Sequence, residues 1–367
     1  MLTKRCTKCL MPPNYPGITF DSKHVCGFCL GTQRYGILGD PQLRDFARQK
    51  EKARADFEKT VTECRGRGKY DCLVPLSGGK DSSYLTYILK QQYGLRVLAV
   101  TVDTGLLSPL QKPNVSRIVA RLNVDHVFVT PKPEFFRKLY RYFLPRPGFQ
   151  KKKYEEIGYV STVCQVCCKA VHSIAMKLAA QKRIPFVALG YSPDQVEHHF
   201  YEVPHEEIHE WSWVPKELYN EPFDEDDRSY FWNPEEFDSD VFPRVLFPFH
   251  AIEYPDEKDV AKKVIELGLI EKGKTSQLVT NCQLNWLMIY LDTLKLGYNP
   301  YVASFSQLVR QGKASRRKWL LLMELADTGV GMGLYMKFWR RKEMKYVLKY
   351  LDLELEDLYR AAKSKIH

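Results

Sequence analysis

The strongest constraint on the fold is a regular alternation of short apolar runs with helical stretches between residues 70 and 200. The apolar runs are typical of buried strands and lie at 70–76, 97–103, 126–130 and 185–190. Helical patterns separate them, at 81–94, 114–122 and 167–181. Because strands that alternate with helices form parallel sheets covered on both faces, the sequence predicts an α/β fold with a parallel, Rossmann-like sheet over 70–200.

The segments outside this core differ from it in composition. Residues 1–38 are rich in Cys and turn formers, and 39–69 are highly charged and predict an exposed connecting helix. Residues 201–245 are acidic, aromatic and without a clear period, whereas 246–367 are helical in pattern. We therefore expect a small N-terminal module, a connecting helix, the core, an insertion loop or lid, and a helical C-terminal part.

Charge is unevenly distributed along the chain. The formal net charge is +11, yet residues 201–240 hold fourteen acidic and two basic residues. The basic remainder suits a polyanionic acceptor such as tRNA or a nucleotide-linked sugar, although a soluble basic surface has the same composition. No apolar stretch is long enough to span a membrane, and the N-terminus lacks an apolar signal region, so we expect a cytoplasmic protein.

Four of the ten cysteines form two C-x-x-C pairs near the N-terminus. Cys6 and Cys9 are separated from Cys26 and Cys29 by sixteen residues, a zinc-ribbon spacing. Two tight turns of this kind bring four soft donors to one tetrahedral ion, and four thiolates leave no open position for water. The pattern predicts a structural zinc site; the alternative is free thiols or a redox pair.

A glycine-rich loop follows the first strand-like run and opens a helix. Its polar and glycine residues are Ser77, Gly78, Gly79, Lys80, Asp81, Ser82 and Ser83. Paired glycines let the backbone approach a phosphate, and the amides of a helix N-terminus can bind its oxygens. The loop is not a Walker A motif. These residues favour phosphate binding over an ordinary strand-to-helix turn.

The sequence Ser77-Gly78-Gly79-Lys80-Asp81-Ser82 resembles the pyrophosphate loop of the N-type ATP pyrophosphatases, the PP-loop superfamily. The resemblance covers about residues 70–200. It implies an adenine nucleotide alpha hydrolase fold that uses ATP and Mg²⁺ and releases AMP and pyrophosphate. It also implies that Asp81 helps to hold the metal and that Asp103, in Val102-Asp103-Thr104-Gly105, lies near the ribose or the metal.

The chemistry of such enzymes depends on making oxygen a good leaving group. A carbonyl-type oxygen of the acceptor attacks the α-phosphate and is later expelled as AMP. The metal and Lys80 stabilise the charge that builds up on pyrophosphate. A sulfur or nitrogen nucleophile then takes the place of the oxygen.

Two branches of this superfamily resemble different parts of the chain. Residues 6–29 and 70–84 resemble the N-acetyl sugar amidotransferases of surface-polysaccharide synthesis, which use ammonia from a glutaminase partner. Residues 164–195 resemble instead the tRNA-thiolation enzymes, in which a C-x-x-C heads the helix before a strand that ends in a Gly-His-x-x-Asp-Asp type loop. Here Gly190 begins Gly-Tyr-Ser-Pro-Asp-Gln, so the histidine and the second aspartate are missing.

The thiolation resemblance implies roles for three cysteines, Cys164, Cys167 and the distant Cys282. Three thiolates can hold a [4Fe–4S] cluster with one iron open to carry sulfur, or one can carry a persulfide that another resolves. We predict that the three converge over the carboxyl ends of the strands, within reach of Lys80 and Asp81 as catalytic residues. Buried structural thiols are the alternative, and we assign that role to Cys64, Cys72 and Cys168.

Several weaker candidates remain, each with a simpler structural explanation. His198 and His199 suggest a metal or acid–base group, but a surface pair is the commoner explanation. The lysines at 151–153 could meet a phosphate, but such a run is usually a solvated surface. Trp211, Trp213 and Trp232 suggest a stacking site or residues that pin the insertion to the body.

Three functions follow from these observations. The first is an ATP-dependent sulfurtransferase that acts on an acceptor such as tRNA, with a sulfur-carrier partner. The second is an amidotransferase that acts on an acetamido sugar, with a glutaminase-type partner. The third is a non-catalytic, zinc-bearing nucleic-acid-binding protein, which the intact loop at 77–82 disfavours. A homodimer is compatible with each.

Overall fold

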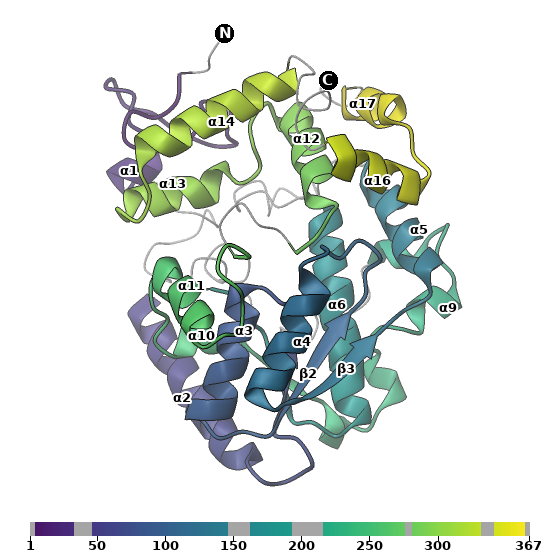
Figure 1. The fold of residues 1–367 in the computed structure, drawn as a ribbon. Helices are drawn as coiled ribbons and strands as arrows, with labels where there is room; N and C mark the ends of the chain where they lie inside the picture. The colour runs from purple at the N-terminus through teal and green to yellow at the C-terminus, as the bar shows by residue number, and fades with distance from the viewer. Residues whose placement is uncertain are drawn as a thin grey trace. The chain divides into compact units, whose positions relative to one another are not determined.

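A computed structural model of the 367-residue chain describes residues 4–32, 46–145, 162–192, 216–275, 281–331 and 341–363. The chain divides into two compact units (Figure 1). The first comprises residues 1–39, 139–165 and 283–367, and the second comprises residues 40–138 and 166–282. Each unit is described by itself.

The second unit contains a five-stranded sheet in which every neighbouring pair is parallel. Its order is β3-β2-β1-β4-β5. The strands are β1 (Cys72–Pro75), β2 (Val97–Val102), β3 (Asp125–Val129), β4 (Phe186–Ala188) and β5 (Arg244–Leu246). The predicted parallel α/β core is therefore confirmed, and the sheet gains one strand, β5, from the end of the segment predicted to be an insertion.

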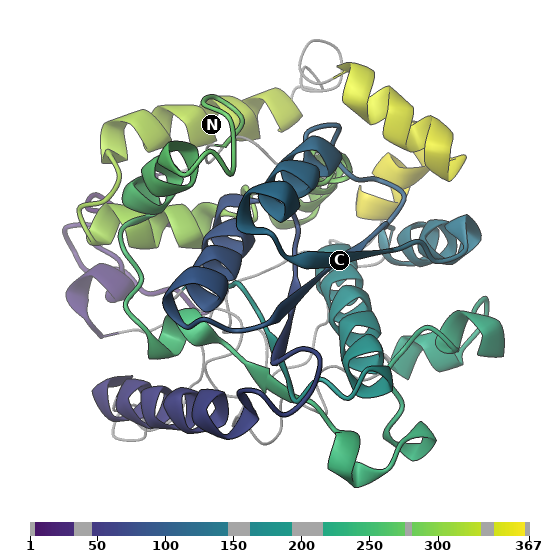
Figure 2. The same ribbon diagram turned by 60° about the horizontal axis from the view of Figure 1, so that its bottom comes forward.

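Side chains alternate between the two faces of the sheet because successive residues of a strand point in opposite directions. On β1, Cys72 and Val74 join one buried cluster, and Leu73 joins the other. The first cluster includes residues of α2 (Phe46–Cys64), α3 (Lys80–Tyr87), α4 (Gln111–Leu122), α10 (Pro248–Ala251) and α11 (Glu257–Glu266). The second includes residues of α6 (Thr162–Gln181), and Figures 1 and 2 show the helices of this unit around the strands.

Helix α2 is part of the core and does not merely connect modules. Ala53, Phe57 and Val61, which are spaced at i, i+4 and i+8 on one face, are all buried in the first cluster. The expectation of an exposed connecting helix is wrong because the many charged residues of this segment hide a narrow apolar stripe. Three apolar residues per two turns are enough to pack a helix against a sheet.

The described part of the acidic segment, residues 216–245, also packs against the second unit. It forms η3 (Lys216–Tyr219), α9 (Glu225–Arg228), η4 (Pro234–Glu236), η5 (Ser239–Val241) and strand β5. Trp232 is 1% exposed, and its backbone N–H donates to Ser173 Oγ at 2.8 Å. Lys138 binds Asp227 at 2.7 Å. Of the two explanations offered for Trp232, pinning the segment to the body is the one that its burial supports.

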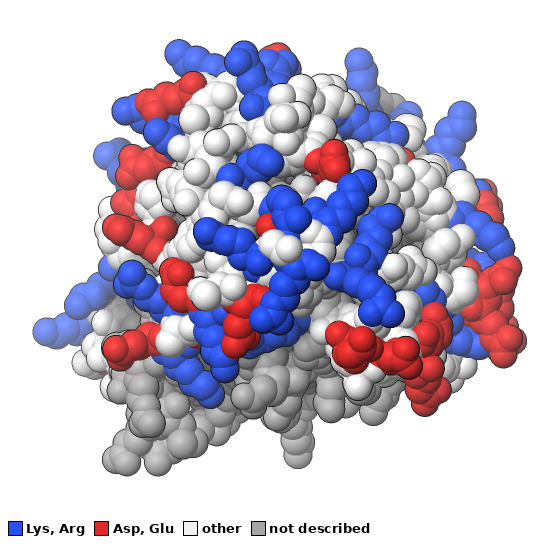
Figure 3. Space-filling view, turned by 90° about the horizontal axis from the view of Figure 1, so that it is seen from below, with Lys and Arg blue, Asp and Glu red and all other residues white. Residues whose placement is uncertain are grey.

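Two further helical segments follow elements of the second unit. A π-helix, η2 (Ile88–Gln92), continues α3, and α5 (Pro133–Phe143) follows β3. Figure 3 shows Lys and Arg side chains gathered near the middle of one face, with Asp and Glu mostly toward its sides. The excess of positive charge expected from the composition is therefore exposed on this face.

The first unit combines the N-terminal residues with the C-terminal helices. Its elements are the short α1 (Gly27–Leu30), α12 (Asn285–Leu296), α13 (Val302–Arg310), α14 (Arg316–Gly331), α16 (Arg341–Leu351) and α17 (Leu355–Lys363). Its buried cluster joins Leu10 and Met11 to Tyr298 and Trp319. The helical C-terminal part is confirmed. Within the described ranges, no helix is long and apolar enough to cross a membrane.

We expect Phe57→Ala to lower the free energy of unfolding by about 3–5 kcal/mol, because it leaves a cavity between α2 and the sheet. Urea denaturation measures the effect. Lys59→Ala, on the exposed side of the same helix, is the matched control and should change stability by about 0.5 kcal/mol or less. Equal effects of the two substitutions would contradict the placement of α2 in the core.

Candidate functional site

The glycine loop lies where the order of the strands reverses. The chain runs outward from β1 through β2 to β3 and then returns to place β4 on the other side of β1. Ligands of open parallel sheets bind at this switch point, outside the carboxyl ends of the strands. Residues 77–79 lie just after the end of β1, and Gly190 lies just after the end of β4. The glycine loop and Gly190 therefore flank the switch point.

The backbone of the loop is fixed by close contacts that only glycine allows. Gly78 has a φ of +71°, and a Cβ there would lie 3.0 Å from Gln111 O. Asn114 Nδ2 donates to Gly78 O at 3.1 Å, which ties the loop to α4. A Cβ on Gly79 would lie 2.6 Å from Asn281 Nδ2 and would displace that side chain. The loop is thus held in one conformation before a ligand binds.

Three hydroxyl groups brace the loop and the start of α3. Ser77 Oγ and Ser82 Oγ are 3.1 Å apart, and the Ser77 N–H donates to Ser82 Oγ at 3.3 Å. Ser83 Oγ donates to Gly79 O at 2.6 Å. The predicted loop residues therefore lie together, and helix α3 begins at Lys80 with its first amides at the loop. Such amides suit anionic oxygens, and the role of the loop in nucleotide binding stays a prediction.

Lys80 and Asp81 lie in a network of charged groups that includes two residues from a distant segment. Lys80 Nζ is 2.7 Å from Asp81 Oδ2 and 2.9 Å from Glu257 Oε1. Tyr254 donates its hydroxyl proton to Asp81 Oδ1. Burial lowers the pKa of Lys80, but the charges of Asp81 and Glu257 outweigh burial and raise it above its usual value. Lys80 is therefore an ammonium ion at neutral pH.

Sequence reasoning missed Glu257 and Tyr254. They lie more than 170 residues from the loop and belong to no motif around it. The only local signal is an acidic residue in the first turn of a helix, which occurs in most helices because it opposes the helix dipole. Only the packing of α11 against α3 shows that they reach Asp81 and Lys80.

Asp103 directly follows the second strand, as predicted, but it also has protein partners. Its Oδ1 accepts from the Gly105 N–H at 2.9 Å, and its Oδ2 is 3.2 Å from Lys112 Nζ. Lys112 in turn lies over the ring of Phe128, 4.9 Å from the centroid. The tight turn at Gly105 aims the carboxylate, and its predicted contact with the ribose or the metal stays a prediction.

Gly190 allows the end of β4 to meet the start of α3. A Cβ there would lie 3.0 Å from Ser82 Cα and 3.2 Å from Ser82 N. This close approach explains the glycine without a nucleotide, and a nucleotide contact stays a prediction. Next to it, Tyr191 and His172 are hydrogen-bonded at 3.0 Å, and burial lowers the pKa of His172 to about 4. That histidine is neutral and structural.

Cys282 is placed near the glycine loop because Asn281, the residue before it, contacts that loop. Asn281 Nδ2 donates to Ser77 Oγ at 3.4 Å, and Asn281 O accepts from the Ser108 N–H at 2.9 Å. Cys282 pairs with Leu107 in an antiparallel bridge and is partly buried. The segment from Asn281 to Cys282 is therefore held near the carboxyl end of β2.

The other two cysteines of the predicted trio begin helix α6. Cys164, Cys167 and Cys168 lie in its first two turns and are partly exposed. Because α6 leads back into β4, its N-terminal end lies toward the carboxyl edge of the sheet. Cys164 falls in the first unit, whereas Cys167 and Cys282 fall in the second, so the convergence of the three stays a prediction.

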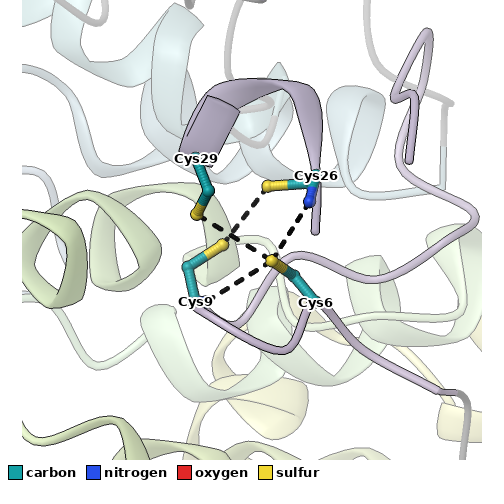
Figure 4. Close-up of side chains that lie close together, drawn as sticks. All are labelled: Cys6, Cys9, Cys26 and Cys29. Carbon is teal, nitrogen blue, oxygen red and sulfur yellow. Dashed lines mark hydrogen bonds between the residues drawn. The ribbon is translucent and has the colours of Figure 1, made fainter. Parts of the chain in front are cut away.

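The N-terminal cysteines form a compact group (Figure 4). Cys6 Sγ is 3.8 Å from Cys29 Sγ, and Cys9 Sγ is 3.5 Å from Cys26 Sγ. All four sulfur atoms lie within 4.8 Å of one another. Four thiolates about 2.3 Å from one tetrahedral ion lie about 3.8 Å apart, so the group fits a single metal ion. A search of the described residues for three or more His, Cys, Asp or Glu side chains that could hold a metal ion finds this group alone.

The backbone around this group is held by residues of the same unit. Arg316 donates to Cys6 O at 2.6 Å and to Cys9 O at 3.0 Å. Arg5 donates to Leu10 O at 2.7 Å and forms an ion pair with Asp327. The C-terminal helices thereby fix the first of the two cysteine turns.

Some sequence candidates lie outside the described residues. They are the lysines 151–153, the end of the loop at 193–195, His198, His199, Trp211 and Trp213.

No protein-family model matches the chain. The glutamine-hydrolysing GMP synthase of Pyrobaculum aerophilum is 30% identical over 111 residues, which are 29% of this chain and 22% of that protein. One subunit of the glutamine-hydrolysing GMP synthase of Archaeoglobus fulgidus is 36% identical over 83 residues, which are 22% of this chain and 27% of that protein. The aligned segment thus spans about a quarter of the length of these curated relatives.

Two solved structures are similar in part. The U34-tRNA thiolase NcsA from Methanococcus maripaludis, with its [4Fe–4S] cluster, has a TM-score of 0.33 and 15% identity and covers 88% of this chain and 89% of that chain. The NH3-dependent NAD synthetase from Campylobacter jejuni has a TM-score of 0.33 and 16% identity, and the match covers 78% of this chain and 97% of that chain. The similarity to the two GMP synthases, over 111 and 83 residues, agrees with the resemblance expected from the glycine loop.

Proposed function

We propose that this chain is a member of the PP-loop ATP pyrophosphatase superfamily and an enzyme that cleaves ATP between the α- and β-phosphates and adenylates a carbonyl-type oxygen of its acceptor. The observation that carries the proposal is the braced glycine loop at the switch point of the sheet, with the Lys80 ammonium beside it. ATP would supply the adenylyl group. Asp81 and Asp103 are the carboxylates that would hold Mg²⁺, since both lie on this edge and offer hard oxygen donors.

The residues of the loop would act mainly on the leaving pyrophosphate. The acceptor oxygen attacks the α-phosphorus, and the bond from that phosphorus to the β-bridging oxygen breaks. Negative charge then builds up on pyrophosphate, where Lys80 and the amides at the start of α3 stabilise it. Because hydrogen bonds hold Ser77, Ser82 and Ser83 in place beforehand, little reorganisation is needed at that moment.

Sulfur is the first candidate for the atom that replaces the oxygen. The position of Cys282 favours it, because the adjacent Asn281 contacts the glycine loop. A thiol there is well placed to carry sulfur to an adenylate formed at the loop. A persulfide on one cysteine would attack the adenylated carbon and expel AMP, and a second cysteine would close a disulfide with the first to release the sulfur. A cluster on Cys164, Cys167 and Cys282 would instead deliver bound sulfide. An acceptor such as tRNA suits the basic chain.

Nitrogen is the second candidate. The names of the two GMP synthases describe glutamine hydrolysis, which releases ammonia. Ammonia would attack the adenylated carbon and expel AMP without help from a thiol. The acceptor would then be an acetamido sugar, with a glutaminase-type partner as donor. None of the four proteins named above is a sugar amidotransferase, so this acceptor rests on the sequence resemblance of residues 6–29 and 70–84.

The N-terminal group would hold a structural zinc ion. The sulfur atoms have the spacing of a single tetrahedral ion, and three backbone N–H groups donate to Cys6 Sγ at 3.4, 3.5 and 3.3 Å. These hydrogen bonds favour a thiolate. Four thiolates fill the coordination shell, which leaves no position for a reacting molecule.

We expect AMP and pyrophosphate, not ADP and phosphate, when the protein is incubated with labelled ATP, Mg²⁺ and a pool of tRNA or of nucleotide-linked acetamido sugars. Lys80→Ala should lower turnover at least about 100-fold because it removes charge stabilisation from the leaving group. Chromatography of the nucleotides measures this. Lys90→Ala, on the neighbouring π-helix, is the control and should remain active. Formation of ADP would refute the proposal.

The replacing atom can be identified by supplying a labelled persulfide donor, labelled sulfide or labelled ammonium together with ATP and each acceptor pool. The persulfide donor supplies sulfur at the oxidation level that a cysteine persulfide needs, and sulfide supplies the cluster route. For sulfur transfer, we expect Cys282→Ser to abolish sulfur incorporation while Cys168→Ser, on α6, preserves it. Mass spectrometry of the product distinguishes the two atoms. If the product contains nitrogen and Cys282→Ser does not prevent this, nitrogen becomes the first candidate for the replacing atom and sulfur the second.

We expect the purified protein to contain one zinc ion per chain and Cys6→Ser to lose it. Because structural zinc sites bind with apparent free energies of about 10–16 kcal/mol, this loss should also lower the Tm. Elemental analysis and thermal unfolding measure the two effects. Cys64→Ser, at the end of α2, should keep the metal. Iron in place of zinc would show that the metal assignment is wrong.

A further inference from the structure

The ammonium group of Lys80 has two carboxylate partners of different origin. Asp81 is its neighbour in the glycine loop, whereas Glu257 belongs to the first turn of α11. The Lys80 side chain is 15% exposed and that of Glu257 is 30% exposed. The Glu257 carboxylate therefore reaches a nearly buried cation from the rim of the site.

The two carboxylates differ in how firmly they are held. Asp81 accepts a hydrogen bond from Tyr254 and two from Lys80, at 2.9 and 2.7 Å. It is also fixed by its place in the first turn of α3. Glu257 approaches at 2.9 Å at the end of a long side chain and is more exposed. Because the Glu257 side chain is longer and more exposed than that of Asp81, rotation of this side chain can break the ion pair with Lys80 without moving the loop.

In the proposed reaction, the same ammonium group has to bind pyrophosphate. A carboxylate oxygen and a phosphate oxygen use the same N–H donors, so they compete for Lys80. Together with Lys80, Asp81 and Glu257 carry a net charge of −1, which repels an incoming polyanion. When Glu257 leaves the ammonium group, its negative charge no longer competes with pyrophosphate. The same movement frees one N–H donor of Lys80 for a phosphate oxygen.

We propose that Glu257 is a displaceable counter-ion of Lys80: it holds the ammonium at the loop in the nucleotide-free protein and yields it to the pyrophosphate oxygens of bound nucleotide. This inference rests on the proposed function, since it takes pyrophosphate as the ligand of the loop. Glu257 is a positioning residue, because it acts through Lys80 and not on the reacting atoms. Its return to Lys80 helps to expel pyrophosphate after transfer.

Binding of inorganic pyrophosphate without Mg²⁺ tests the competition directly, by calorimetry. We expect Glu257→Gln to bind pyrophosphate about tenfold more tightly than the wild type, the effect of one charge-assisted hydrogen bond. Glu257→Asp should fall between the two. Glu266→Gln, at the other end of α11, is the matched control and should bind like the wild type. An affinity of Glu257→Gln that is equal to or weaker than that of the wild type overturns the inference.

A second measurement needs no ligand and reports on the contact itself. The Glu257 charge contributes to the raised pKa of Lys80, together with that of Asp81. Glu257→Gln should therefore shift the acetylation of Lys80 by acetic anhydride to lower pH, as measured by mass spectrometry of the peptide. An unchanged profile overturns the contact. A purely structural ion pair would produce the same shift, so the displacement itself is tested by the tighter binding of pyrophosphate to Glu257→Gln.

The two measurements separate this inference from the proposed function. If neither the wild type nor Glu257→Gln binds pyrophosphate, the proposed function fails and the displacement fails with it. If the wild type binds pyrophosphate and Lys80→Ala does not, but Glu257→Gln leaves the affinity unchanged, only the displacement fails.

Discussion

The site depends on the close approach of two backbones at the centre of the sheet. Because the strand order reverses between β1 and β4, the chain leaves both strands next to each other at the carboxyl edge. Gly190 has no side chain and lets this end of β4 lie against Ser82. That contact sets where α3 begins and hence where the loop presents Lys80. The hydroxyl contacts of Ser77 and Ser83 then hold a geometry that the backbone has already imposed.

Much of the sheet could be predicted from the sequence, because buried parallel strands are short, continuous apolar runs. The runs at 97–103 and 126–130 differ from β2 and β3 by a residue or so at their ends. Strand β5 escaped prediction because Arg244–Leu246 is only three residues long and follows an acidic stretch without period. The burial of α2 was not predicted because its three apolar positions are hard to recognise among many charged residues.

The site was predictable where its residues are neighbours in sequence and unpredictable where they are not. The loop from Ser77 to Ser83 is one segment, so its spacing carries a recognisable pattern. Glu257 and Asn281 reach the same loop only through the packing of distant segments. No local pattern marks either one, since a single acidic residue or amide in a polar stretch is common. The cysteines lie between these cases: the spacing of Cys6, Cys9, Cys26 and Cys29 already indicated the compact group that is seen.

The contacts of Arg316 have a consequence for how this chain is synthesised. The carbonyl groups of the first cysteine turn are bound by a residue that is synthesised more than three hundred positions later. Ser306 Oγ, likewise, accepts a hydrogen bond from the Leu10 N–H at 3.3 Å. Domains usually fold as units, beginning at the N-terminus while synthesis proceeds. The N-terminal module of this chain instead acquires these partners only after the segment from Ser306 to Arg316 has been synthesised. Until then, a metal ion on its four thiolates would be the main constraint that keeps the nascent module compact.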